Sequence, residues 1–292
     1  MNIARPIDDI RTLLQASLQD ALLGDEAPRD LNAPRVDDGL FGPASVTWQV
    51  HQDASMLIGG IRALLLQTMH PLAMAGVAQH SSYETDPFGR LRRTSRYVGA
   101  VSFAPTAEAL GAITMVKRVH ERVRGIAPDG RAYSANDPHL LAWVHHALVD
   151  SFLRSYQRYG RAPLSSEDAD RYVAEQSTLA ELIGGVEPAP ARSVAELRAW
   201  LHGIRPELRS TREARDAAFF LLTVPMAPTM AVPYGVLLSA AITSLPGFVR
   251  RALWLPSSQL AAKVMIEPSA RAVTRTLSWA MTNPRDVRPH NH

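Results

Sequence analysis

Apolar residues recur at helical spacing along almost the whole chain, and this periodicity limits the folds open to it. No segment alternates apolar and polar residues for long enough to predict a sheet. Helices are expected at about 7–23, 44–50, 53–78, 89–98, 107–125, 136–160, 166–184, 193–202, 211–224, 232–244, 247–254 and 258–281. The pattern therefore predicts an all-α, multi-helix fold that is too uneven for a simple four-helix bundle.

Residues that begin and end helices support this division of the chain. Ser193 precedes one helical pattern, and Gly160 and Gly184 follow two others, as N-terminal caps and C-terminal stops usually do. No internal repeat is present. We expect an N-terminal helix and linker at 1–37, a single all-α domain at 38–283, and a disordered tail at 284–292.

The composition excludes several classes of protein and site. The chain has no Cys, which removes disulfides, thiolate-held zinc, iron–sulfur clusters and covalently attached haem. The net charge is +3, with 31 Lys and Arg against 28 Asp and Glu and no long basic run, so we expect no nucleic-acid partner. Phosphate-binding loops, the Gly-x-Ser-x-Gly and His-Glu-x-x-His motifs, and the Glu-x-x-His pairs of di-iron bundles are also missing.

A long uncharged stretch at residues 217–249 bears on membrane contact. Four prolines divide it, so no span of about 20 apolar residues remains. We expect two buried helices there and no transmembrane span; peripheral contact with a membrane, or the wall of an apolar tunnel, is the alternative. The amino terminus lacks the apolar core of a secretory signal, and we expect a cytoplasmic protein.

His120 differs from the other nine histidines because two cations share its side of an expected helix. Lys117 lies three residues before it and Arg124 four residues after it, which places all three on one face. Two long cations beside an apolar face need an anion, or must extend to the surface. A haem would supply iron for the imidazole and propionates for the cations. The alternative is a histidine satisfied within the core.

A second polar group lies on the preceding expected helix, where Arg90, Arg93 and Thr94 share one face. One interpretation is the Arg-rich start of a surface helix, stabilised by Glu84 and Asp86. The other is a guanidinium and a hydroxyl directed at a ligand of the iron, where they would stabilise developing negative charge.

The remaining candidates are other histidines. His70 precedes a proline that must kink or interrupt its helix, so it either bonds the freed backbone or lines a pocket, and both readings stay open. His145 and His146 point about 100° apart on a helix, and a core or supporting role is expected for each. His51 and Asp53 have the His-x-Asp spacing of non-haem iron enzymes, but they begin a helix, and a structural role is expected.

Six segments occur in an order typical of a known family: Leu40–Trp48, Leu64–Val77, Arg90–Thr94, His120, Tyr133–Pro138 and Trp143–His145. Over about residues 38–255 the chain resembles the MpaB-type oxygenases, which include the latex-clearing proteins, or rubber oxygenases. The resemblance implies an all-α orthogonal bundle with a globin-like core around a non-covalent haem b.

The resemblance also implies roles for the matched residues. His120 would be the proximal iron ligand. Arg90 and Thr94 would match the family's distal Arg-x-x-x-Thr pair. Arg93 falls where latex-clearing proteins carry a Lys that can close the distal site. Latex-clearing enzymes also use an acid upstream of the Arg; the nearest match here, Glu84, lies closer to the Arg in sequence than that acid does.

The basic residues that the family places near the propionates would correspond to Lys117 and Arg124. His70 and His145 complete the set of expected cofactor-binding residues.

We therefore expect a b-type haem oxygenase that uses dioxygen on an apolar or isoprenoid-like small molecule, with oxidative C=C cleavage as the candidate reaction. One alternative is a haem protein that acts as a sensor, carrier or peroxidase-like protein. Another is a helical interaction protein that has lost haem. The sequence assigns no oligomeric state.

Overall fold

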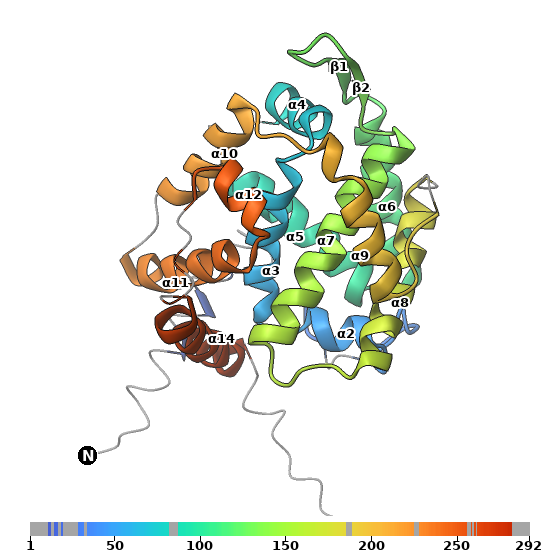
Figure 1. Cartoon of the computed structure of the whole chain (residues 1–292). Coiled ribbons are helices and arrows are strands. Elements are labelled where there is room, and N and C mark those ends of the chain that lie inside the picture. Colours follow the sequence, from blue (N-terminus) through green and yellow to red (C-terminus); the bar gives the residue numbers. More distant parts are fainter. Residues whose placement is uncertain are drawn as a thin grey trace, which may run out of the picture.

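The computed structural model describes residues 11–12, 15–16, 19, 29–31, 34–81, 87–184, 189–224, 228–255, 258, 260 and 262–281. Within them nearly all of the regular secondary structure is helical (Figure 1), which confirms the all-α prediction. The expected tail at 284–292 lies outside the described residues. Of the expected first helix, the described residues 11–12, 15–16 and 19 are helical.

The helices are α2 (Val46–His51), α3 (Ser55–Gln67), α4 (Pro71–His80), α5 (Pro87–Phe103), α6 (Thr106–His120), α7 (Pro138–Tyr159), α8 (Ser166–Gly184), α9 (Val194–Gly203), α10 (Arg212–Thr223), α11 (Pro228–Ser244), α12 (Gly247–Ala252) and α14 (Glu267–Met281). A 3₁₀-helix, η1 (Arg205–Glu207), follows α9, and a π-helix, η2 (Ala262–Ile266), precedes α14. In the described part of the chain, the strands are β1 (Arg124–Ile126) and β2 (Ala132–Ser134).

Helices α3 and α7 pack against each other at the centre of the bundle, with α11 on α3 and α8 on α7. Trp143 and Phe152 of α7 and Ile58 and Leu65 of α3 are buried. Burying side chains of this size contributes roughly 1.5–3 kcal/mol each. The two central helices therefore form a rigid frame from which the other elements are positioned.

Gly59 permits the close approach of α3 to α7. A Cβ atom at position 59 would lie 2.8 Å from Phe152 Cδ1 and 3.2 Å from Phe152 Cα, whereas one at Gly60 would meet nothing within 4 Å. We expect Gly59→Ala to destabilise the fold by about 1–3 kcal/mol because the helices must move apart. Gly60→Ala should be neutral or stabilise by up to about 1 kcal/mol, because Ala favours the helix. Urea denaturation of both variants checks this, and equal effects would contradict it.

Helices α5 and α6 form a helical hairpin. A two-residue link, Ala104 and Pro105, joins them, and they pack side by side. Residues 90–94 lie in the first half of α5, and residues 117–120 form the last turn of α6.

The β-hairpin corrects the expected helix at 107–125, which ends at His120. Gly125 pairs with Tyr133, and Arg124 pairs with Ser134, in an antiparallel two-stranded sheet. Gly125 has low helix propensity, and Tyr133 Oη donates to Gln79 Oε1 at 2.7 Å, which holds the hairpin on α4. Strands of three residues are too short to show an alternating pattern.

Two other expected helices are also divided. The expected helix at 53–78 separates into α3 and α4 at His70, whose extended backbone precedes Pro71, because a proline disfavours helical conformation in the residue before it. The expected helix at 258–281 consists of η2 and α14. Among the described residues, no helix is both long and apolar enough to cross a membrane.

Candidate functional site

His120 is the last residue of α6, where the chain turns toward β1. Its carbonyl accepts the N–H of Val123 at 3.1 Å. The ring is half-buried, and its Nδ1 atom is buried without a hydrogen-bond partner. Burial lowers the pKa of His120, since a charged imidazole would lose its hydration. His120 is therefore a neutral imidazole whose buried Nδ1 atom has no hydrogen-bond partner.

Lys117 and Arg124 differ in their relation to His120. Lys117 is half-buried one helical turn before His120 on α6, so those two share a helix face as expected. Arg124 lies in β1 and is exposed. The prediction that Arg124 shares the helical face of His120 is wrong, because α6 ends four residues earlier.

The expected distal residues lie on α5, the other half of the hairpin. The backbone of Arg90 lies in the first turns of α5, and Arg93 and Thr94 follow on the next turn, where both side chains are exposed. The Arg90 side chain lies outside the described residues, as does Glu84. The Arg90–Thr94 segment thus lies on the helix that precedes α6 and contacts it.

His70 is buried at the break between α3 and α4. Both of its ring nitrogens are buried without hydrogen bonds. Its ring lies 6.3 Å, centroid to centroid, from those of His139 and Trp143. Its Nε2 atom is 3.7 Å from Glu207 Oε2. The sequence left two roles open for His70, a hydrogen bond to the backbone freed by Pro71 or a place in the lining of a pocket. The hydrogen bond to the backbone is not made in the described part of the chain.

The paired histidines of α7 have different surroundings. His146 Nδ1 donates to Ala142 O at 2.7 Å, and its Nε2 accepts the Ala191 N–H at 3.0 Å, so it is a fully satisfied core residue. His145 is half-buried with its ring 5.2 Å from that of His146. Burial lowers the pKa of His145, and His146 adds a smaller effect in the same direction.

The His-x-Asp pair at 51 and 53 is structural, as expected. His51 is buried, with Nδ1 hydrogen-bonded to Ser102 Oγ at 2.6 Å and Nε2 to Tyr172 Oη at 3.0 Å. Burial lowers its pKa to about 3, so the ring is neutral. Asp53 accepts the backbone N–H of Ser55 at 2.8 Å. Both ring nitrogens of His51 are engaged, which leaves none for a metal.

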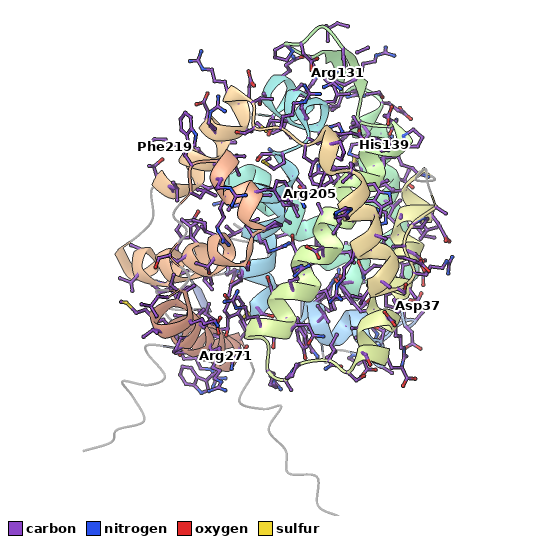
Figure 2. All side chains as sticks on the ribbon, in the orientation of Figure 1. Asp37, Arg131, His139, Arg205, Phe219 and Arg271 are labelled. Carbon is purple, nitrogen blue, oxygen red and sulfur yellow. The ribbon has the colours of Figure 1, made fainter. Side chains whose placement is uncertain are left out.

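The uncharged segment at 217–249 forms most of the core around α10 and α11. Ala218, Leu238 and Ile242 are buried in one apolar cluster, and Leu237 and Ala241 in another. The expected burial is confirmed for one side of these helices only. An exposed apolar fringe remains on the outer side, where Phe219 of α10 is 65% exposed at the periphery (Figure 2).

Sequence reasoning gave no role to His139 or Glu207. His139 lies in the first turn of α7, and Glu207 ends η1. His139 Nε2 lies 2.9 Å from Glu207 Oε2. Neither residue stands in a recognisable motif. The feature of the sequence that pointed to this region was the expected helix break at His70. Tertiary packing brings His139 and Glu207 close to that break.

The fold and these residues define an all-α protein with an unpartnered imidazole at the end of a helical hairpin. Residues 48–279 match the family model described as "ER-bound oxygenase mpaB/B'/Rubber oxygenase, catalytic domain". The chain belongs to this oxygenase family. Neither the curated proteins nor the solved structures contain a match to it.

Proposed function

We propose that this protein is a b-type haem-dependent oxygenase that acts on an apolar, isoprenoid-like substrate. The observation that carries the proposal is His120, whose buried Nδ1 has no partner within the region matched by the oxygenase family. A buried polar atom without a hydrogen bond is costly, and a metal bond to the imidazole would satisfy the site. Haem, when bound, supplies the iron that binds and activates dioxygen.

The residues around His120 suit this cofactor. His120 would hold the iron as a neutral imidazole, the form in which histidine binds metals. Lys117 on α6 and Arg124 on β1 would supply counter-charges for propionates, the first from the helix and the second from the strand. His145, an imidazole whose pKa burial lowers, would line the pocket as a neutral side chain.

The opposite side of the pocket would be formed by α5. Arg90 and Thr94 would donate hydrogen bonds toward dioxygen, and Arg93 would add positive charge near its entry. Donors fixed in advance where negative charge develops are the largest source of stabilisation in many enzymes. The role of these residues is to orient the reactant and to offset developing charge.

We propose oxidative cleavage of a carbon–carbon double bond as the reaction. One dioxygen molecule would place one oxygen atom on each carbon of the alkene, giving two carbonyl products and requiring no external reductant. Apolar substrate would bind through burial of its hydrocarbon surface. Dioxygen uptake and carbonyl formation should therefore occur in a ratio of one to two.

Hemin titration of the purified protein, followed by oxygen-electrode assays on the ferrous form with a polyisoprenoid alkene, tests this function. We expect a Soret band that saturates at one hemin per chain, and dioxygen consumption that depends on the alkene. A Soret band without alkene-dependent uptake would contradict the oxygenase and favour a haem sensor or carrier. An absorbance spectrum that hemin does not change would remove the haem assignment as well.

A further inference from the structure

We propose that His70, His139 and Glu207 form a binding site for a divalent transition-metal ion. The three residues come from the α3–α4 break, the start of α7 and the end of η1. None of them belongs to the α5–α6 hairpin of the haem proposal, and the inference does not rest on that proposal.

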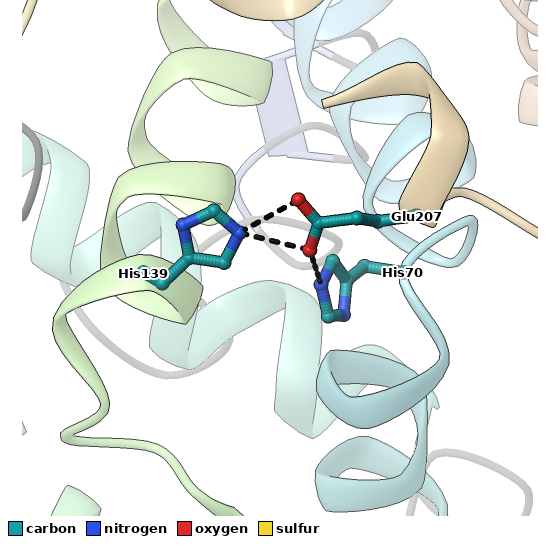
Figure 3. A group of neighbouring side chains, drawn as sticks. All are labelled: His70, His139 and Glu207. Atoms are coloured by element: carbon teal, nitrogen blue, oxygen red, sulfur yellow. Dashed lines mark hydrogen bonds and ion pairs between the residues drawn. The ribbon is translucent and has the colours of Figure 1, made fainter. Parts of the chain in front are cut away.

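The donor atoms of this cluster are already close together. One nitrogen of each imidazole and one carboxylate oxygen lie within 4.8 Å of one another. Glu207 stands between the rings in Figure 3: His139 Nε2 is 3.1 Å from Oε1 and 2.9 Å from Oε2, and His70 Nε2 is 3.7 Å from Oε2. Ligands bound at about 2.0–2.2 Å to Zn²⁺ stand roughly 3–3.5 Å apart. Small side-chain movements would therefore complete the coordination.

His70 supplies a second, independent indication of a ligand. Its side chain is 3% exposed, and both ring nitrogens lack a hydrogen-bond partner. The distance of 3.7 Å from Nε2 to Glu207 Oε2 is too long for a hydrogen bond. Buried polar groups in folded proteins are nearly always satisfied. A metal ion at the carboxylate would satisfy the Nε2 lone pair of His70, which faces it.

Hydrogen bonds to the main chain fix the segments that carry the three donors. Asp137 Oδ1 caps α7 by accepting the N–H groups of His139 at 2.9 Å and Leu140 at 3.1 Å. On the other side, the Arg209 N–H donates to Met69 O at 2.8 Å. That bond ties the segment after Glu207 to the residue before His70. Donors on fixed elements lose little conformational entropy when they bind an ion.

An aromatic wall lies behind the cluster. The ring of Trp143 stacks on that of Trp200 with centroids 6.5 Å apart, and the His139 ring lies 6.3 Å from Trp200. Trp143 is fully buried, and its Nε1 donates to Gln67 O at 3.2 Å. Apolar surroundings of this kind strengthen the bonds between a cation and its ligands by lowering the local dielectric.

The other side of the cluster opens to solvent. The side chains of His139 and Glu207 are 43% and 47% exposed, so an ion can enter and keep water in its remaining positions. Two imidazoles and one carboxylate are the ligands of catalytic zinc sites and of non-haem Fe²⁺ sites. Ca²⁺ and Mg²⁺ prefer all-oxygen sites. The donor set therefore selects a transition metal of the Zn²⁺ or Fe²⁺ type.

Titration of Co²⁺ into chelator-treated, full-length protein, followed by visible absorbance, tests the site. We expect one Co²⁺ per chain, displaced by Zn²⁺, and a rise in Tm on addition of Zn²⁺ because the ion binds the folded state. Glu207→Gln and His139→Gln should each weaken Co²⁺ binding by about 100-fold or more, since even the loss of a supporting residue costs about 10–100-fold. Both side chains are half-exposed, so the variants should fold.

Two control variants keep the test specific. Glu213→Gln removes a carboxylate outside the cluster, and a variant with His290→Gln and His292→Gln removes the histidines of the carboxyl terminus; both should retain the binding. Hemin binding by Glu207→Gln should be unchanged, which separates this site from His120. The proposal is overturned if the wild type binds no Co²⁺, if binding disappears with the terminal histidines, or if Glu207→Gln binds as tightly as the wild type.

Discussion

Replacing His120 with Gly is expected to abolish stable hemin binding while leaving the helical fold intact. The imidazole is the proposed iron ligand, and loss of a direct ligand should exceed the about 10–100-fold cost of losing a supporting residue. His120 is the last residue of α6, a place where Gly is well tolerated, so the variant should fold. Hemin titration by Soret absorbance measures the loss, and far-ultraviolet circular dichroism reports the fold.

Chemical rescue makes this expectation more specific. Added imidazole should enter the space vacated in His120→Gly and restore the Soret band of the wild-type protein, because the ring is held there by packing and not by a hydrogen bond from Nδ1. His202→Gly, at an exposed position near the end of α9, is the matched control and should bind hemin normally. An unchanged hemin affinity and spectrum in His120→Gly would refute the assignment of His120 as ligand.

Helix positions were largely predictable because the sequence marks their ends. The helix α8 has the predicted bounds of 166–184, and Gly184, where it ends, has a φ of 152°. The predicted range of 136–160 for α7 is within two residues of the observed one, since Asp137 caps its start and Gly160 follows its end. Local side-chain and backbone preferences decide these points.

The elements that the sequence did not predict depend on tertiary contacts. The β-hairpin exists because Tyr133 and Gln79 hold it against α4, and such contacts leave no periodic signal. The error over Arg124 follows directly, since the expected helix was extended past His120 to residues that lie in β1. The break at His70 agrees with the kink or interruption expected at Pro71, because proline restricts the residue before it.

The two candidate sites also differ in how far they could be predicted from the sequence. His120 and Lys117 could be related from the sequence because three residues span one helical turn. The cluster around His70 draws its other members from positions 139 and 207. No spacing rule relates residues so far apart, and tertiary contacts such as the hydrogen bond from the Arg209 N–H to Met69 O bring Glu207 near His70.

The second large effect concerns stability, and we expect Asp150→Ala to destabilise the fold by about 3–5 kcal/mol. Arg62 is fully buried, and its Nη2 donates to Asp150 Oδ2 at 2.8 Å. Its Nη1 donates to Ser151 Oγ at 2.6 Å. Burial lowers the pKa of Arg62, and Asp150 opposes that shift. Without Asp150, the guanidinium remains buried and unpaired between α3 and α7, and urea denaturation measures the loss.

We attribute the loss of stability in Asp150→Ala to the buried, unpaired charge of Arg62. Two further expectations follow from this cause. The double variant Arg62→Met/Asp150→Ala should be more stable than Asp150→Ala alone, because no unpaired cation remains in the core. The exposed pair of Arg192 and Glu181 is the control, and Glu181→Ala should change stability by less than about 1 kcal/mol. If the double variant is less stable than the single one, Arg62 contributes through its packing, and the unpaired charge is not the cause of the loss.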